Sequence, residues 1–142
     1  MAVEIQDLGH LVKRLQHRHH RAADSSLIAI GTTLAQWDAL RAISRCPDAS
    51  AHQLATLTFQ TDQSFGPLAT RMIARGLIER TPGAGRAFKH SLTPAGAAML
   101  ERGNQVINAL LIKSFEPLNA KEQATLHGLL VRVLGQRLLP IE

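Results

Sequence analysis

Basic side chains are concentrated in one short stretch near the middle of the chain. Between residues 61 and 93 the charged side chains are Asp62 and Glu79 on the negative side and Arg71, Arg75, Arg80, Arg86 and Lys89 on the positive side. Five positive and two negative groups leave a balance of +3, against +5 for all 142 residues. Such a surface neutralises phosphates and releases their counterions, which is typical of nucleic-acid binding.

The first residues of this basic stretch carry groups that can read base edges. Thr61 and Ser64 offer hydroxyls, and the amide of Gln63 can bond adenine through two hydrogen bonds. The alternative for these residues is simple helix capping. Arg71 is expected to contact phosphate or to form a salt bridge within the chain, and Lys89 is expected to contact phosphate.

Three other side chains invite a ligand or redox role, each with a structural alternative. His17 and His20 share a helix face with His19 beside them, but zinc sites usually add Cys, Asp or Glu, so we expect no metal and no cofactor. Trp37 lines an effector pocket with His17, or it packs in the core. The single cysteine, Cys46, is expected to be a buried, inert thiol.

Composition argues against several classes of protein. One cysteine excludes an internal disulfide framework. The apolar runs are far shorter than the ~20 residues that span a bilayer, and Glu4 and Asp7 lie where a signal peptide would be basic and apolar, so we expect a cytoplasmic protein. Tyrosine is absent and aromatic residues make up 4%, unlike proteins that stack single-stranded bases. Nothing resembles a metalloprotease motif or a nucleophile elbow, so no enzyme is favoured.

The elements that position these residues are predicted from apolar spacing and caps. Apolar residues at helical spacing predict a helix over residues 4–21, before a break at Gly31. Capping boxes at TLAQ (33–36) and SAHQ (50–53) begin a second helix and a short third one. After a break at 59–61, a further helix runs to about Arg75.

The second half of the chain is predicted to begin with a hairpin. Gly76 ends the preceding helix, and strands at 77–80 and 87–92 flank a turn-rich loop. Thr93 and Pro94 begin a long helix that ends at Pro117, and a last helix spans 119–138. The fold class is therefore mainly α with a small β-hairpin wing. A short helix, a tight break, a helix and a hairpin form the plan of a winged helix-turn-helix.

With its elements in this order, the sequence resembles the MarR family of transcription regulators. The segments that carry the resemblance are TLAQ (33–36) with Leu40, QLA (53–55), Arg71, RGLIER (75–80), GR (85–86) and LTPAG (92–96). The resemblance implies a homodimer with two winged lobes on a pseudo-palindromic operator in double-stranded DNA. In many members a small-molecule effector alters DNA binding. It also implies that Arg86, at the tip of the wing, contacts the minor groove or the sugar-phosphate backbone.

The sequence departs from the family pattern at three places. Pro67 lies where the family continues a regular helix. A proline in the interior of a helix destabilises it by roughly 3 kcal/mol, whereas near the start of a helix its missing N–H would have no partner in any case. With Gln63 or Ser64 as the cap the penalty disappears, whereas a cap at Thr61 would make Pro67 kink the helix. Gly85 replaces the acidic residue that often precedes the wing arginine, and the family's phenolic and redox residues are not evident.

We therefore expect one domain, residues 1–142, with a winged helix-turn-helix lobe at 33–93 and dimerisation helices at 2–21 and 95–140. Its predicted function is sequence-specific binding of double-stranded DNA, as a repressor with a possible small-molecule effector. The predicted DNA-binding residues are Thr61, Gln63, Ser64, Pro67, Arg71, Arg86 and Lys89. Two alternatives are a winged-helix module for protein interaction and a small-ligand-binding protein without specific DNA binding.

Overall fold

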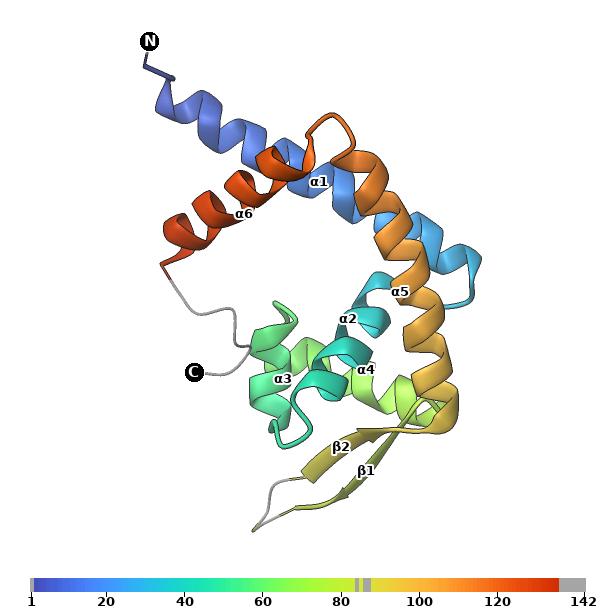
Figure 1. Ribbon diagram of the computed structural model, residues 1–142. Helices are drawn as coiled ribbons and strands as arrows, with labels where there is room; N and C mark the ends of the chain where they lie inside the picture. Colours follow the sequence, from blue (N-terminus) through green and yellow to red (C-terminus); the bar gives the residue numbers. More distant parts are fainter. Residues whose placement is uncertain (1, 84, 86–87, 136–142) are drawn as a thin grey trace.

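The computed structural model describes residues 2–83, 85 and 88–135 and is mainly helical, as the sequence predicts (Figure 1). Its elements are α1 (Ile5–Ala29), α2 (Leu34–Arg45), α3 (Ala51–Leu57), α4 (Asp62–Ala74), β1 (Ile78–Pro82), β2 (Phe88–Leu92), α5 (Pro94–Ser114) and α6 (Ala120–Leu134). The strands pair antiparallel, with Ile78 opposite Leu92 and Pro82 opposite Phe88. None of the described helices is both long and apolar enough to span a bilayer.

Helices α2, α3 and α4 share one core with the hairpin. Its best-enclosed large side chains are Leu40, Leu54, Phe65, Met72 and Ile78. Burying a side chain of this size stabilises a fold by ~1.5–3 kcal/mol. Because these residues come from all three helices and β1, they fix α4 against α3 and the hairpin. The side of α4 that faces away from this core stays exposed.

A smaller core joins this lobe to α1 and α5. Leu27 of α1, Trp37 of α2 and Ile107 of α5 are its main members. The indole Nε1 of Trp37 donates a hydrogen bond of 3.1 Å to Oδ1 of Asn104. Gly103 lies directly against the indole, where an added Cβ would be 2.7 Å from Nε1. Of the two alternatives for Trp37, the structure shows core packing.

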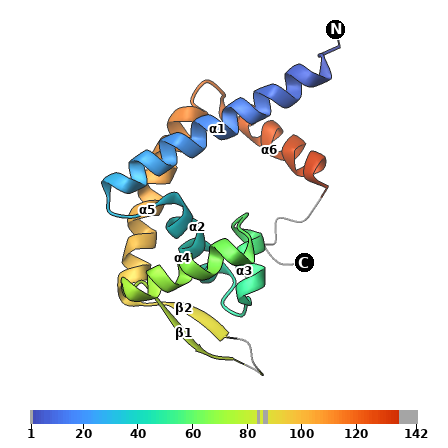
Figure 2. The ribbon, with the colours of Figure 1, turned by 180° about the vertical axis from the view of Figure 1, so that it is seen from behind.

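The outer part of α1 and the whole of α6 lie at the end of the molecule opposite the hairpin (Figure 2). No residue of α6 is buried. Both helices expose large apolar side chains, which are Ile5, Leu8, Leu11 and Val12 on α1 and Leu129, Leu130, Val133 and Leu134 on α6. These are the helices that the sequence assigns to dimerisation.

Four predicted boundaries are wrong. Helix α5 ends at Ser114 instead of at Pro117, because a proline disfavours helical conformation in the residue before it. The first helix does not end near residue 21 but continues to Ala29, because Ala23 and Leu27 extend the apolar spacing and are buried in the smaller core. The last helix ends at Leu134 rather than at 138, because Gly135 caps it in a left-handed conformation with φ 62°. The first strand extends to Pro82, where the missing N–H is tolerated at the end of a two-stranded hairpin.

One of the two predicted capping boxes is confirmed, and the other is only half formed. Ser50 accepts from the N–H of Gln53, whose side chain accepts in return from the N–H of Ser50. At the start of α2, the hydroxyl of Thr33 accepts from the N–H of Gln36 at 3.1 Å. The Gln36 side chain, however, accepts from the Thr32 hydroxyl at 3.1 Å and from Arg75, the C-cap of α4.

Candidate nucleic-acid interface

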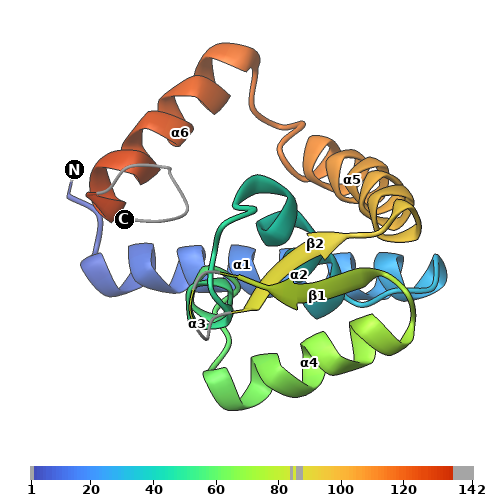
Figure 3. The same cartoon turned by 90° about the horizontal axis from the view of Figure 1, so that it is seen from below.

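Helix α4 has one side in the core and the other in solvent. Its buried side chains are Phe65, Leu68, Ala69 and Met72. On the opposite side Gln63, Pro67 and Thr70 are exposed at i, i+4 and i+7, which places them along one stripe of the helix. The hairpin lies beside α4 at the surface that Figure 3 views from below. This arrangement gives one protruding helix with a polar outer stripe and a hairpin next to it.

Thr61 begins α4 and holds its first turn. Its hydroxyl accepts from the backbone N–H of Ser64 and donates to the Ser64 hydroxyl, both at 3.1 Å. Helix capping, the alternative for these residues, therefore takes place. Gln63 is also exposed, and no side-chain hydrogen bond of Gln63 occurs within the described residues. Of the predicted base-reading groups, the Gln63 amide is thus the one that capping leaves available.

Pro67 lies inside α4 because the helix is capped at Thr61, and neither Gln63 nor Ser64 serves as the cap. The helix continues past the proline to Ala74. A proline lacks the N–H that would donate to the carbonyl four residues earlier, which here is that of Gln63. The carbonyl of Gln63 therefore lacks its usual donor within the helix, and the proline ring lies against it.

Asp62, at the first position of α4, pairs with His52 of α3. The imidazole Nδ1 lies 3.0 Å and 3.1 Å from the two carboxylate oxygens, and both side chains are largely exposed. When His52 is protonated, the pair offsets the negative charge beside the predicted interface. The pair also connects the first turns of α3 and α4.

Arg71 in α4 and Arg75, the C-cap of α4, differ in their surroundings. Arg71 is exposed and forms no ion pair or hydrogen bond with any described residue, so its guanidinium remains available. Arg75 donates to Oε1 of Gln36 at 2.6 Å and to the carbonyl of Gly31 at 2.7 Å. Arg75 therefore ties the end of α4 to the α1–α2 turn and to α2.

The wing carries the remaining predicted cations. Nζ of Lys89 lies 3.1 Å from Oδ1 of Asp48. An exposed pair of this kind contributes only ~0–1 kcal/mol, so a phosphate could replace the carboxylate. The guanidinium of Arg80 lies over the ring of Phe88, 5.4 Å from its centroid. Arg86 lies outside the described residues.

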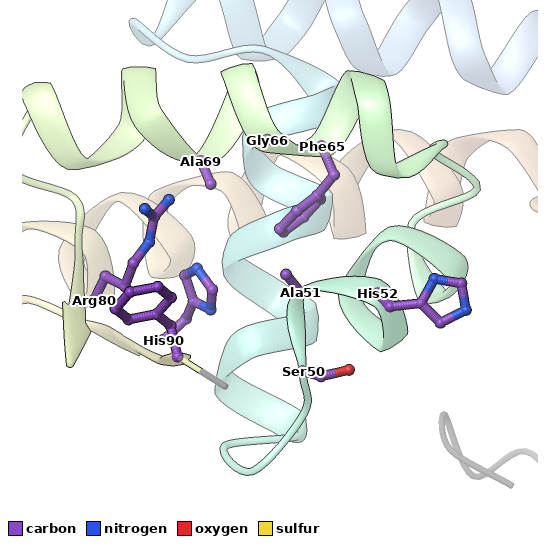
Figure 4. Close-up of a pocket in the computed structure, with 9 residues that line it drawn as sticks. Ser50, Ala51, His52, Phe65, Gly66, Ala69, Arg80 and His90 are labelled. Carbon is purple, nitrogen blue, oxygen red and sulfur yellow. The ribbon is translucent and has the colours of Figure 1, made fainter. Parts of the chain in front are cut away.

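A cavity of about 410 Å³ lies between α3, α4 and the hairpin (Figure 4). Its chemistry comes from Arg80, His90 and the rings of Phe65 and Phe88. The ring of His90 is 3% exposed, and neither of its nitrogens has a hydrogen-bond partner among the described residues. Burial, and secondly the positive charge of Arg80, lowers the pKa of His90. The cavity thus combines apolar walls with a neutral imidazole and a cation.

The predicted effector residues do not meet in one cavity. His17 is exposed and lines a shallow hollow of about 740 Å³ on α1, whereas Trp37 is buried in the smaller core. His19, from the same histidine cluster, is hydrogen-bonded to the Ser114 hydroxyl at 2.6 Å. Within the described part of the chain, no group of three His, Cys, Asp or Glu residues could hold a metal ion. Cys46 is buried, as predicted.

Two residues of these surfaces were not selected from the sequence. Thr70 lies on the outer stripe of α4, and the i+3 spacing from Pro67 is the signal that would have found it. His90 points into the core beside Phe65, with the ring centroids 6.3 Å apart. Its alternation with the exposed Lys89 along β2 was the available signal, because successive strand residues face opposite sides.

Comparison with known proteins gives consistent matches. A family model described as the MarR family matches residues 30–87. The HTH-type transcriptional repressor Rv2887 of Mycobacterium tuberculosis is 26% identical over 118 residues, which cover 82% of this chain and 85% of the repressor. The structure of Rv2887 in complex with salicylic acid has a TM-score of 0.75 at 25% identity, covering 89% of this chain and 95% of that one.

Two further solved structures match over nearly their full length. A probable transcriptional regulator from Pseudomonas aeruginosa is 30% identical with a TM-score of 0.77, covering 92% of this chain and 99% of that one. A mutant of MarR from E. coli, complexed with operator DNA, has a TM-score of 0.80 at 26% identity, covering 92% and 95% of the two chains.

Proposed function

The chain belongs to the MarR family, and on that premise we propose that it is a homodimeric transcription regulator that binds a pseudo-palindromic operator in double-stranded DNA as a repressor. The observation that carries the proposal is the exposed polar stripe of α4 beside the hairpin, in a fold shared with a MarR protein complexed with operator DNA. In a winged helix-turn-helix the second helix enters the major groove with its N-terminal residues at the base edges.

The proposal assigns a role to each site residue. The Gln63 amide reads a base, with adenine as the best partner. Thr61 and Ser64 hold the first turn and place their hydroxyls at the groove. Arg71 contacts phosphate, and Lys89 does so after leaving Asp48. Arg86 is assigned to the wing contact from the family resemblance alone.

A second copy of the chain is part of the proposal. The apolar side chains that α1 and α6 expose are of the kind that obligate dimer interfaces bury. In such a dimer the two α4 helices would lie about one turn of DNA apart, roughly 34–36 Å, in adjacent major grooves. A molar mass of twice 15.5 kDa in light scattering at micromolar concentration supports the dimer, and a monomer under those conditions contradicts it.

We also assign the cavity between α3, α4 and the hairpin to a small effector. Its cation, Arg80, suits a carboxylate, and its aromatic walls suit a flat ring. The relative Rv2887 has been solved with salicylic acid and with p-aminosalicylic acid, which have this chemistry. Calorimetric titration with salicylate tests the assignment. Arg80→Gln should abolish salicylate binding and leave the melting temperature of the protein unchanged. Equal affinity in both proteins contradicts it.

The proposal includes no catalytic reaction. The relatives named above are transcriptional repressors and regulators, and their class is the one we carry to this chain. A regulator of this class acts where chromosomal DNA lies, which for a bacterial protein is the cytoplasm.

The proposed base contact can be tested by exchanging one amide side chain. Gln63→Ala should lower affinity for the operator more than for a scrambled duplex, by ~1–3 kcal/mol at the position that it reads. Gln105→Ala removes an exposed amide from α5 and serves as the control. Fluorescence anisotropy with both duplexes measures the two losses. An equal loss on both duplexes would refute base reading by Gln63.

A further inference from the structure

The turn between α3 and α4 has an unusual residue at its tightest point. The backbone N–H of Phe59 donates to the carbonyl of Thr56 at 3.2 Å, and that of Gln60 donates to the carbonyl of Ala55 at 2.8 Å. These two bonds form the Schellman motif that ends many helices, with Thr58 as the C-cap. The residue after the cap then adopts a left-handed conformation, for which glycine is usual. Here it is Phe59, with φ 58°.

Neither the turn nor the core accounts for a phenylalanine at this position. Phe59 is the only residue other than glycine with a positive φ in the described part of the chain. A side chain strains a left-handed backbone, and bulky residues adopt it rarely. A large aromatic side chain ordinarily stabilises a fold by burial, but 97% of Phe59 is exposed. The residue therefore carries strain and exposed apolar surface without a compensating contact in the single chain.

The place of Phe59 in the fold indicates what covers it. The turn leads directly into α4, and Phe59 lies two residues before Thr61, the cap of that helix. Its exposed uncharged neighbours in sequence are Thr56, Thr61 and Gln63. The one acidic group there, Asp62, is paired with His52. A polar surface of this kind, whose one carboxylate is held by an imidazole, can approach a phosphate backbone.

A protein partner fits this position less well. Protein interfaces bury clusters of apolar residues around their anchors. Among the residues that the structure describes, the other large exposed apolar side chains lie on α1 or just before it, on α5, on α6 and on the hairpin, so Phe59 stands alone at its turn. A single ring beside a groove-binding helix matches the apolar surfaces that DNA presents, which are the thymine methyl group and the deoxyribose face.

We infer that Phe59 is an apolar DNA-contacting residue at the edge of the recognition surface, packed against a thymine methyl group or a deoxyribose ring. This inference rests on the proposed function and adds an apolar contact to the polar ones of α4. The two backbone bonds of the turn hold the ring in place before binding, so that little additional ordering is needed when DNA arrives.

The test uses a substitution for which strain and contact predict opposite effects. Phe59→Gly removes the ring and gives the left-handed position its preferred residue. Its melting temperature should equal or exceed that of the wild type, while its affinity for operator DNA should fall roughly tenfold, as expected for loss of a buried aromatic contact. Phe59→Tyr keeps the ring and should bind within about twofold of the wild type.

Modified DNA identifies the surface that is contacted. If the ring meets a thymine methyl, replacing that thymine with deoxyuridine weakens the wild type and leaves Phe59→Gly unchanged. If it meets deoxyribose, Phe59→Gly loses affinity equally for operator and scrambled duplexes. Both results support a DNA contact. If a folded Phe59→Gly dimer binds the operator as tightly as the wild type, the inference is overturned and the proposed function is not. A melting temperature of Phe59→Gly below that of the wild type contradicts the backbone strain. A wild type that shows no preference for the operator overturns the proposed function as well.

Discussion

Gly96, at the start of α5, is predicted to tolerate no side chain. The first turn of α5 packs directly on the segment that joins α4 to β1. A Cβ at position 96 would overlap the carbonyl oxygen of Leu77 and lie 2.9 Å from its carbonyl carbon, whereas ordinary contact begins at about 3.4 Å. The obstructing atoms belong to the backbone, so no rotamer change can relieve the overlap. Gly96→Ala must therefore move α5 away from Leu77.

The expected destabilisation follows from the bonds that such a shift disturbs. Thr93 donates its backbone N–H to the Leu77 carbonyl at 3.1 Å, and its hydroxyl donates to the carbonyl of Gly76. Loss of one hydrogen bond costs ~1 kcal/mol, and overpacking costs ~1–3 kcal/mol. The higher helix propensity of alanine returns at most ~1 kcal/mol. We expect the free energy of unfolding to fall by roughly 2–3 kcal/mol, or the melting temperature by about 6–10 °C.

Thermal denaturation followed by circular dichroism measures this change, at equal protein concentrations because a dimer melts in a concentration-dependent way. Gly128→Ala is the matched control, since it makes the same substitution in α6 at a position with open space. It should melt at the wild-type temperature or up to ~4 °C above it. A Gly96→Ala protein as stable as the wild type would refute the packing argument, as would an equal loss in the control.

Four further changes test other parts of the structure. Arg75→Ala should lower the unfolding free energy by ~1–3 kcal/mol and leave the salt dependence of DNA binding unchanged, because its guanidinium is bonded within the chain. Arg71→Ala should have the opposite pattern. It should leave the free energy of unfolding within ~0.5 kcal/mol of the wild type and reduce the slope of log DNA affinity against log salt concentration, the salt slope, by about one. Gly103→Ala should destabilise by ~1–3 kcal/mol and shift Trp37 fluorescence, since the new methyl displaces the indole. Burial lowers the pKa of His90, so acidification through its ordinary value near 6.5 should destabilise the wild type more than His90→Leu.

Each of these predictions has a contradicting result. A lower salt slope in Arg75→Ala would place that guanidinium on DNA, and an unchanged slope in Arg71→Ala would remove Arg71 from it. Unaltered fluorescence in Gly103→Ala would contradict close packing on the indole. For His90 the sign is fixed, because the unfolded state binds the proton more readily than the folded state. Stability must therefore decrease as the pH falls below about 6.5. Parallel pH profiles for the wild type and His90→Leu would contradict the buried neutral ring.

Features set by neighbouring residues were predictable from the sequence. Ser50 and Thr93 begin helices because each cap is completed by a backbone N–H three residues later. Gly76 follows α4 with φ 73°, as the sequence predicts for a helix end. Cys46 is buried because its helix ends against the core of the lobe.

Features that depend on distant contacts were not predictable. The side chain of Gln36 was expected to complete a capping box, but Thr32 and Arg75 occupy its oxygen. Arg75 counts among the basic side chains of the central stretch, and no local pattern reveals its bond to a residue of α2. The sequence likewise leaves the cap of α4 undecided, because an early cap at Thr61 requires an interior proline. The core contacts of Phe65 and Met72 accompany the early cap.

The central claim is that the chain binds operator DNA specifically as a dimer. The most direct measurement is a titration of the purified protein against DNA from its own upstream region and a scrambled duplex, at several salt concentrations. We expect two chains per operator, at least ~10³-fold preference over the scrambled duplex, and an affinity that falls steeply with salt. Equally weak binding to both duplexes would contradict it and leave a basic winged-helix scaffold whose partner is not DNA.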